Sequence, residues 1–164
     1  NKLLNKKIIN SLIKLSKEHR VKPKKIQTLG CIIDPSLSIS VDNFIDLSNS
    51  IQLKEKDIKI ITFQENKNTF NVFSSMNITP ACISFMGNLN GKDSLEFISF
   101  EYDILINFFK NNKFLTLLSS KTKANFRVGF DSVDSELNDL IFSQQIIKYA
   151  DFKSELIKYL KMIE

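Results

Sequence analysis

The sequence predicts an α/β fold, in which a mainly parallel sheet of about five strands lies between two layers of helices. Short, nearly continuous apolar runs indicate strands that are buried on both faces. These runs alternate with segments whose apolar residues recur at helical spacing, an order typical of crossover units and therefore of a parallel sheet. Within the 164 residues, we expect a basic amphipathic helix and connector over 1–25 and a single α/β domain over 26–164.

The first helix is predicted from a stripe of apolar residues near the start of the chain. Its members follow one another at steps of four, four and three, and they are Leu4, Ile8, Leu12 and Leu15. The residues that widen the stripe are Leu3, Ile9 and Ile13. Because Pro23 disfavours further helix, we expect this helix to end near residues 19–21.

The first crossover unit follows this helix. The run IQTLGCII (26–33) predicts a strand, which Asp34 and Pro35 close. Residues 40–53 predict a helix, in which Asp42 places a negative charge in the first turn, where the helix dipole favours it. DIKIITF (57–63) then predicts the second strand.

The second half of the chain continues the alternation. Its strands are predicted at 70–73, 81–85, 102–108, 126–129 and 140–142. Its helices are predicted at 93–99, 113–123 and 146–163. The run ACISF at 81–85 follows Pro80, and the helix at 93–99 has a cap in Asp93 or Ser94. Asn111 or Asn112 is the predicted cap of the helix at 113–123.

The composition is that of a globular protein. Hydrophobic residues make up 43% of the chain, which has only four glycines and three prolines, so it lies far from the composition of disordered segments. No apolar run approaches the roughly 18 residues needed to cross a bilayer. The two cysteines, Cys31 and Cys82, lie in apolar runs and form no disulfide or zinc pattern. We therefore expect a soluble, cytoplasmic protein.

Several sequence motifs of known chemistry are missing. Residues 34–38, which follow the first strand, lack the glycines of a dinucleotide-binding turn. The phosphate-binding loop of NTPases, the nucleophile elbow of hydrolases and paired-cysteine zinc motifs are also missing. The only histidine, His19, is expected to be exposed at the end of the first helix. We therefore expect no catalytic residue, no cofactor and no metal.

Polar residues near strand ends define a possible ligand crevice, because open α/β sheets bind ligands beyond the carboxyl ends of their strands. Its candidate residues are Asp34, Ser36, Asn107, Lys110 and Arg127. Asp34 has an alternative role, since Asp-Pro-Ser is also a common turn or cap. We expect Arg127 in a turn, where Lys121 and Lys123 would join it in a second basic cluster.

Residues 102–131 carry a local resemblance to a known enzyme family. Tyr102-Asp103 followed by three apolar residues, and Ala124, Arg127 and Gly129-Phe130 further on, resemble a segment in the acceptor-side half of heptosyltransferase-type glycosyltransferases. Asn107 stands where that family usually has Asp. The resemblance implies a Rossmann-like fold. A complete enzyme of that family has a second domain for the nucleotide sugar, for which this chain has no room.

The whole chain resembles a small, uncharacterised single-domain family of Bacteroidota-type bacteria. The resemblance is carried by the Lys-rich first helix, the strand ending in Asp34, YDILI, ANFRVG and the closing YLKMI. It implies the same Rossmann-like, three-layer fold and supplies no activity.

Charge is the feature that points to a function. The first 25 residues hold nine Lys or Arg against one acid, Glu18, a net charge of +8, whereas the rest of the chain is at −3. The predicted anion contacts are Lys2, Lys6, Lys7, Lys14, Lys17, Arg20, Lys22, Lys24 and Lys25. We expect a non-catalytic protein that docks through these residues on an anionic partner, with RNA or a ribonucleoprotein favoured over duplex DNA. The alternatives are a domain that binds a small ligand or sugar nucleotide and is related to half of a glycosyltransferase, and a protein-partner or structural module.

Overall fold

The computed structural model describes residues 1–65, 76–131, 135–143 and 148–162. Six strands form one sheet in the order β3-β2-β1-β4-β5-β6, and every neighbouring pair is parallel. The strands are β1 (Leu29–Ile33), β2 (Ile58–Phe63), β3 (Met76–Ile78), β4 (Glu101–Phe108), β5 (Lys123–Phe130) and β6 (Leu140–Phe142). The predicted α/β fold is thus confirmed, with one strand more than expected.

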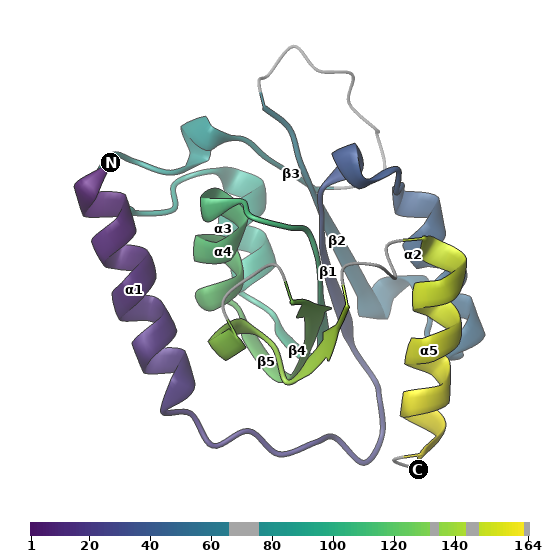
Figure 1. Cartoon of the computed structure of the whole chain (residues 1–164). Helices are drawn as coiled ribbons and strands as arrows, with labels where there is room; N and C mark the ends of the chain where they lie inside the picture. Colours follow the sequence, from purple (N-terminus) through teal and green to yellow (C-terminus); the bar gives the residue numbers. More distant parts are fainter. Residues whose placement is uncertain (66–75, 132–134, 144–147, 163–164) are drawn as a thin grey trace.

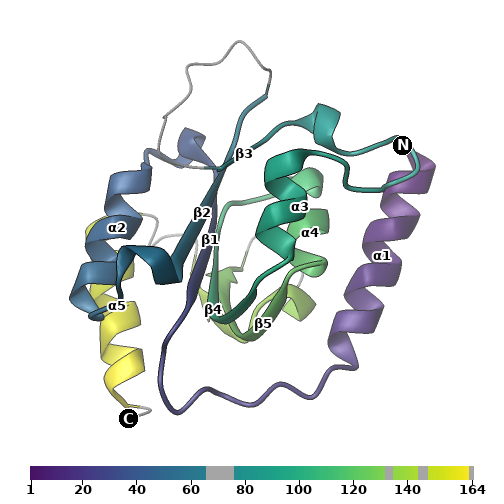
Figure 2. The ribbon, with the colours of Figure 1, turned by 180° about the vertical axis from the view of Figure 1, so that it is seen from behind.

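Helices cover both faces of this sheet (Figures 1 and 2). The helices α2 (Val41–Ser50) and α5 (Tyr149–Met162) lie on one face, and α3 (Lys92–Ile98) and α4 (Lys113–Ser120) lie on the other. The first helix, α1 (Lys2–Ser16), packs on the outside of α4 and of the short 3-10 helix Ser135–Leu137. The molecule therefore has a further helical layer on the side of α3 and α4.

The local sequence explains where these elements begin. Asn112 caps α4 because its side chain accepts hydrogen bonds from the backbone N–H groups of Phe114 and Leu115. The Ser40 hydroxyl and the Asn43 side chain form a capping box at the start of α2. The β1 strand begins later than expected because the N–H groups of residues 27 and 28 donate to the carboxylate of Asp103, at 2.8 and 3.2 Å.

The predicted strand at 81–85 is wrong. Residues Pro80–Cys82 form a 3-10 helix, and Ile83 makes only an isolated bridge to Leu89. The third strand lies earlier, at Met76–Ile78. The pattern misleads because an apolar run of five residues is compatible with a strand whether or not a neighbouring strand is in place. The extended piece predicted at 70–73 lies outside the described residues.

The brief strand predicted at 126–129 is confirmed, but the turn expected at Arg127 is wrong. These residues belong to the eight-residue strand β5, whose last five residues are buried. The strand 140–142 is confirmed, and the final helix is confirmed over Tyr149–Met162.

A close contact across the sheet requires glycine at position 30. A Cβ atom added to Gly30 would lie 2.9 Å from two carbons of the Tyr102 ring. That ring is fixed, since its hydroxyl donates to the carbonyl of Phe97 at 2.7 Å and the two rings pack 5.0 Å apart.

We expect Gly30→Ala to lower the free energy of unfolding by about 1–3 kcal/mol, because the added methyl overpacks a fixed ring. Urea unfolding followed by circular dichroism measures the loss. An unchanged or raised midpoint would contradict it, since alanine at an uncrowded strand position stabilises relative to glycine.

Candidate anion-binding surface

The basic helix α1 is attached to the rest of the molecule by its apolar stripe. Asn1 caps it, accepting from the N–H groups of Leu3 and Leu4 at 3.0 and 3.3 Å. The buried residues of the helix are Leu4, Ile8, Leu12 and Leu15, the four that the spacing predicted. Because this stripe packs on α4 and the 3-10 helix, the opposite face of α1 is held in a fixed orientation toward solvent.

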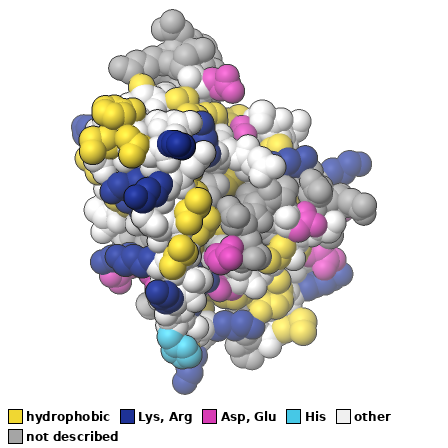
Figure 3. Space-filling view, turned by 60° about the vertical axis from the view of Figure 1, so that its left-hand side comes forward, with side chains coloured by type: hydrophobic (Ala, Val, Ile, Leu, Met, Phe, Trp, Pro, Cys, Tyr) yellow, Lys and Arg dark blue, Asp and Glu magenta, His cyan; other side chains and the backbone are white. Residues whose placement is uncertain are grey.

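The outer face of α1 carries lysines with apolar residues between them. Its exposed lysines are Lys2, Lys6, Lys7, Lys14 and Lys17. Leu3, Ile9 and Ile13 do not widen the buried stripe as expected; they are 46–56% exposed. Figure 3 shows hydrophobic and basic side chains next to one another over this side of the molecule. We call the five lysines, together with Lys121 described next, the α1 lysine surface.

Lys121 joins this surface from α4. It follows the last residue of that helix, and its pKa is lowered by partial burial and then by the nearby charges of Lys7 and Lys14. The charges of Lys7 and Lys14 therefore act on the ammonium group of Lys121. Within the described part of the chain, none of the ion pairs involves any of the six lysines of the α1 lysine surface. The sequence groups Lys121 with Arg127 and Lys123 instead, because the packing of α1 on α4 joins positions more than 100 residues apart.

Arg20 and Lys22 in the connector after α1 are occupied by contacts within the protein. The guanidinium of Arg20 pairs with Asp139, with Nη2 and Oδ1 2.8 Å apart, and also donates to the Leu15 carbonyl. The Lys22 ammonium lies over the ring of Tyr159, 4.8 Å from its centroid, and donates to the hydroxyl of that residue. Neither cation is free in the way that the sequence prediction assumes.

Lys24 and Lys25 are exposed but lie elsewhere. They line a hollow of about 580 Å³ near the C-terminal ends of α2 and α5, the helices that cover the face opposite α1. The structure thus divides the nine predicted anion contacts. Four lie on α1 and Lys17 is its C-cap residue, two are engaged in contacts with the protein, and two lie at the far end of the connector.

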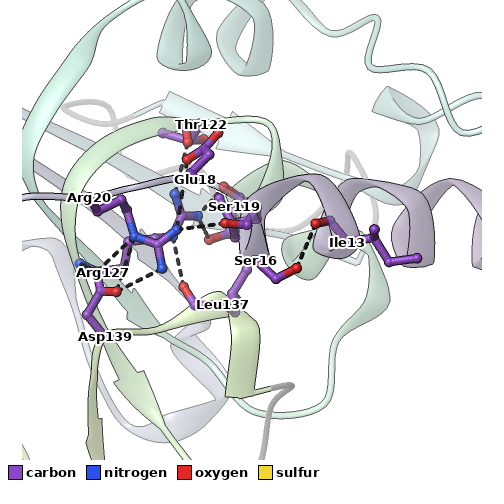
Figure 4. A network of polar contacts seen from close by, with 10 residues as sticks. Ile13, Ser16, Glu18, Arg20, Ser119, Thr122, Arg127, Leu137 and Asp139 are labelled. Carbon is purple, nitrogen blue, oxygen red and sulfur yellow. Dashed lines mark hydrogen bonds and ion pairs between the residues drawn. The ribbon is translucent and has the colours of Figure 1, made fainter.

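Arg127 is placed differently from the prediction, because it lies inside β5 and its side chain is fully buried. Its guanidinium donates to the carbonyls of Leu137 and Thr122, at 2.8 and 3.0 Å, and to the carbonyl of Ser119 (Figure 4). Burial lowers its pKa to about 10, with a smaller contribution from Arg20. The group is therefore still protonated at neutral pH. Two of its acceptors belong to the C-terminal end of α4, where a cation complements the helix dipole.

The carboxylate of Asp139 links Arg127 to the connector after α1. Asp139 accepts from the backbone N–H of Arg127 at 2.9 Å while it pairs with Arg20. The same network therefore ties the end of α1, strand β5 and the segment after the 3-10 helix together (Figure 4). Arg127 holds elements together and is not accessible to a ligand.

The remaining crevice residues are only partly brought together. The order of the sheet reverses between β1 and β4, so Asp34 and Lys110 lie at the carboxyl ends of neighbouring strands. Asp34 accepts from the N–H of Ser36 at 3.0 Å and caps a 3-10 helix, which is the alternative role that the sequence allows. Asn107 is buried, and its amide donates to Asn138 at 2.8 Å.

A hollow of about 680 Å³ at this end of the sheet is formed by other residues. It lies between α1, the end of β2 and the start of α4, with Ile8, Phe63 and Phe114 among its lining. None of the five predicted crevice residues lines it. Ligand binding at this edge stays a prediction.

Metal-ligating side chains do not gather within the described ranges. There, no group of three or more His, Cys, Asp or Glu side chains is arranged to hold a metal ion. Cys31 is buried in β1, which raises its pKa, and Cys82 is a free thiol of intermediate burial. No helix in the described part of the chain is long and apolar enough to cross a membrane.

Fold and surface together define an α/β protein with a Rossmann-like, all-parallel sheet and a basic helix packed outside it. A family model matches residues 1–163, and the chain belongs to that family, a family of unknown function (DUF6913). No curated protein and no solved structure matches the chain. The family match agrees with the resemblance of the whole chain to an uncharacterised family, while the local resemblance to glycosyltransferases receives no support from these comparisons.

Proposed function

We propose that this protein is a non-catalytic, cytoplasmic docking protein that binds an anionic partner through the α1 lysine surface, and that the partner is RNA, free or within a ribonucleoprotein. The observation that carries the proposal is the packing of α1, whose buried apolar stripe holds its exposed lysines toward solvent without a paired carboxylate in the described residues. Polyanions such as RNA bind to such a face because the lysines displace condensed counterions.

Lysines are suited to this role because their ammonium groups neutralise phosphates as point charges without reading bases. The proposal therefore concerns affinity and placement on the RNA, and it does not require sequence recognition by α1. Lys24 and Lys25 lie beside the ends of α2 and α5, on the face opposite α1. We therefore assign the RNA contact to the lysines of α1 and to Lys121.

We expect the protein to bind RNA with an affinity that falls steeply with salt. A plot of the logarithm of the association constant against the logarithm of the salt concentration should have a slope of roughly −0.7 to −0.9 for each phosphate that the protein neutralises. Replacing Lys2, Lys6, Lys7, Lys14 and Lys17 by Gln should weaken binding and make that slope shallower by about 4. Fluorescence anisotropy of a labelled RNA over a salt series measures both quantities.

The matched control replaces five exposed lysines that lie away from α1 by Gln: Lys54, Lys56, Lys148, Lys158 and Lys161. The two variants have equal net charge, so a contact specific to α1 predicts that only the first loses binding. Equal losses in both, or binding that does not respond to salt, would contradict the proposal.

A further inference from the structure

An exposed aromatic side chain lies beside the α1 lysine surface. The residues 83–89 form a tight loop, closed by the bridge between Ile83 and Leu89 and by a hydrogen bond from the N–H of Gly87 to the Ser84 carbonyl at 2.9 Å. At the tip of this loop, Phe85 is 70% exposed. Leaving so large an apolar side chain in water costs hydrophobic free energy that a partner could recover by covering the ring.

Two contacts fix this loop against α1. The side-chain amide of Asn1 donates to the carbonyl of Phe85 at 3.0 Å. The side chain of Lys7 lies against Gly87, so closely that a Cβ atom there would be 2.7 Å from the Lys7 Cγ. Gly87 also has φ of +83°, a conformation that glycine adopts without strain. The loop that carries Phe85 is therefore held against the first two turns of α1, with the Phe85 carbonyl at Asn1 and Gly87 at Lys7.

An exposed aromatic ring beside a row of lysines favours one class of partner over others. A second copy of the chain would bring like charges together, because both copies would present lysines. A double-stranded nucleic acid would leave the aromatic ring uncovered, since bases inside a double helix already stack on one another. An unpaired base next to a phosphate chain satisfies both features, because sites for single strands combine a positive track with aromatic rings on which bases stack.

We propose that Phe85 is a stacking platform for an unpaired base of single-stranded RNA, whose phosphates continue past Lys7 toward Lys14 and Lys121. This inference rests on the proposed function and names the form of RNA that the site takes. Single-stranded RNA supplies the anionic backbone, and the exposed ring supplies an attraction that salt does not screen. The two contributions are therefore separable by experiment.

The test uses the full chain and a labelled oligouridylate of about 15 nucleotides, a length within the range that single-strand sites occupy. We expect Phe85→Ala to weaken binding by about tenfold at every salt concentration, with an unchanged salt slope. Phe85→Trp should keep or strengthen binding. Replacing Lys7 and Lys14 by Gln should instead make the slope shallower, by about 0.7 for each phosphate that the variant no longer neutralises.

The matched control is Phe100→Ala. Phe100 is 38% exposed and has the ammonium of Lys59 4.8 Å from its ring centroid, so it is a phenylalanine beside a lysine in the turn before β4, away from α1. We expect this variant to bind as tightly as the parent.

The outcomes separate this inference from the proposed function. If RNA binds through the lysines but Phe85→Ala binds as well as the parent, or if a duplex of equal length binds as tightly as the single strand, the stacking platform is refuted and the proposed function stands. If no RNA binds at low salt, both fall. If vesicles containing phosphatidylglycerol bind the protein and the oligouridylate does not compete, the exposed apolar and basic face belongs to a membrane surface and both proposals are overturned.

Discussion

Replacing Arg127 by methionine is expected to lower the free energy of unfolding by about 3 kcal/mol, because it leaves buried carbonyl groups without donors. Three carbonyls, those of Ser119, Thr122 and Leu137, accept from its guanidinium in the interior. Arg127→Lys should lose nearly as much, since one ammonium cannot reproduce the planar set of donors that reaches all three acceptors. Urea unfolding of the parent and both variants measures these losses.

Arg20 provides the control for this prediction. Arg20→Met removes a neighbouring guanidinium that keeps some exposure to solvent, and Asp139 still accepts from the backbone N–H of Arg127. We expect a loss of about 1 kcal/mol or less. A stability of Arg127→Met equal to that of the parent would show that the carbonyls find other donors, and would remove Arg127 from its structural role.

Phe108→Ala is expected to lower the free energy of unfolding by about 4 kcal/mol, because it opens a cavity in the centre of the core. The ring of Phe108 is fully buried between α2, α5 and the sheet. It packs edge-on against the rings of Phe44, Phe130 and Phe152, with centroids 5.5, 4.9 and 5.1 Å away. Urea unfolding followed by circular dichroism measures this loss as well.

Two further variants test whether the loss depends on the volume removed and on the place of the residue in the core. Phe108→Leu keeps most of the volume and should cost about 1 kcal/mol. Phe100→Ala, at a partly exposed site with the Lys59 ammonium over its ring, should cost about 1 kcal/mol. Similar midpoints for Phe108→Ala and Phe100→Ala would contradict the position of Phe108 in the core.

The elements that can be predicted from the sequence are those whose residue pattern is compatible with only one local structure. The strand Leu29–Ile33 is buried along its whole length, and the cap at Asn112 is where its side chain type indicates. The prediction at 81–85 fails because burial of Ile83 and exposure of Phe85 depend on the bridge to Leu89 and on the position of α1.

Only part of the candidate site can be predicted from the sequence. The lysines of α1 are visible in the sequence because they are close together along one helix. Lys121 is not, because its proximity to Lys7 arises only when α1 packs on α4. The prediction for Arg127 is wrong for a different reason: its partners are backbone carbonyls, which every residue has and which leave no signal in the sequence. Phe85 reads as a core residue because an aromatic residue is buried more often than not.

The docking of α1 has a consequence for the order of events during synthesis. The surface that receives its apolar stripe is made of residues 113–120 and 135–137, more than 90 positions later in the chain. While the ribosome is still making those residues, Leu4, Ile8, Leu12 and Leu15 lack the surface of α4 on which they pack in the folded protein. The lysines and these leucines and isoleucines therefore emerge together on an unattached amphipathic segment. It becomes a fixed surface only when the second half of the sheet has brought α4 into place.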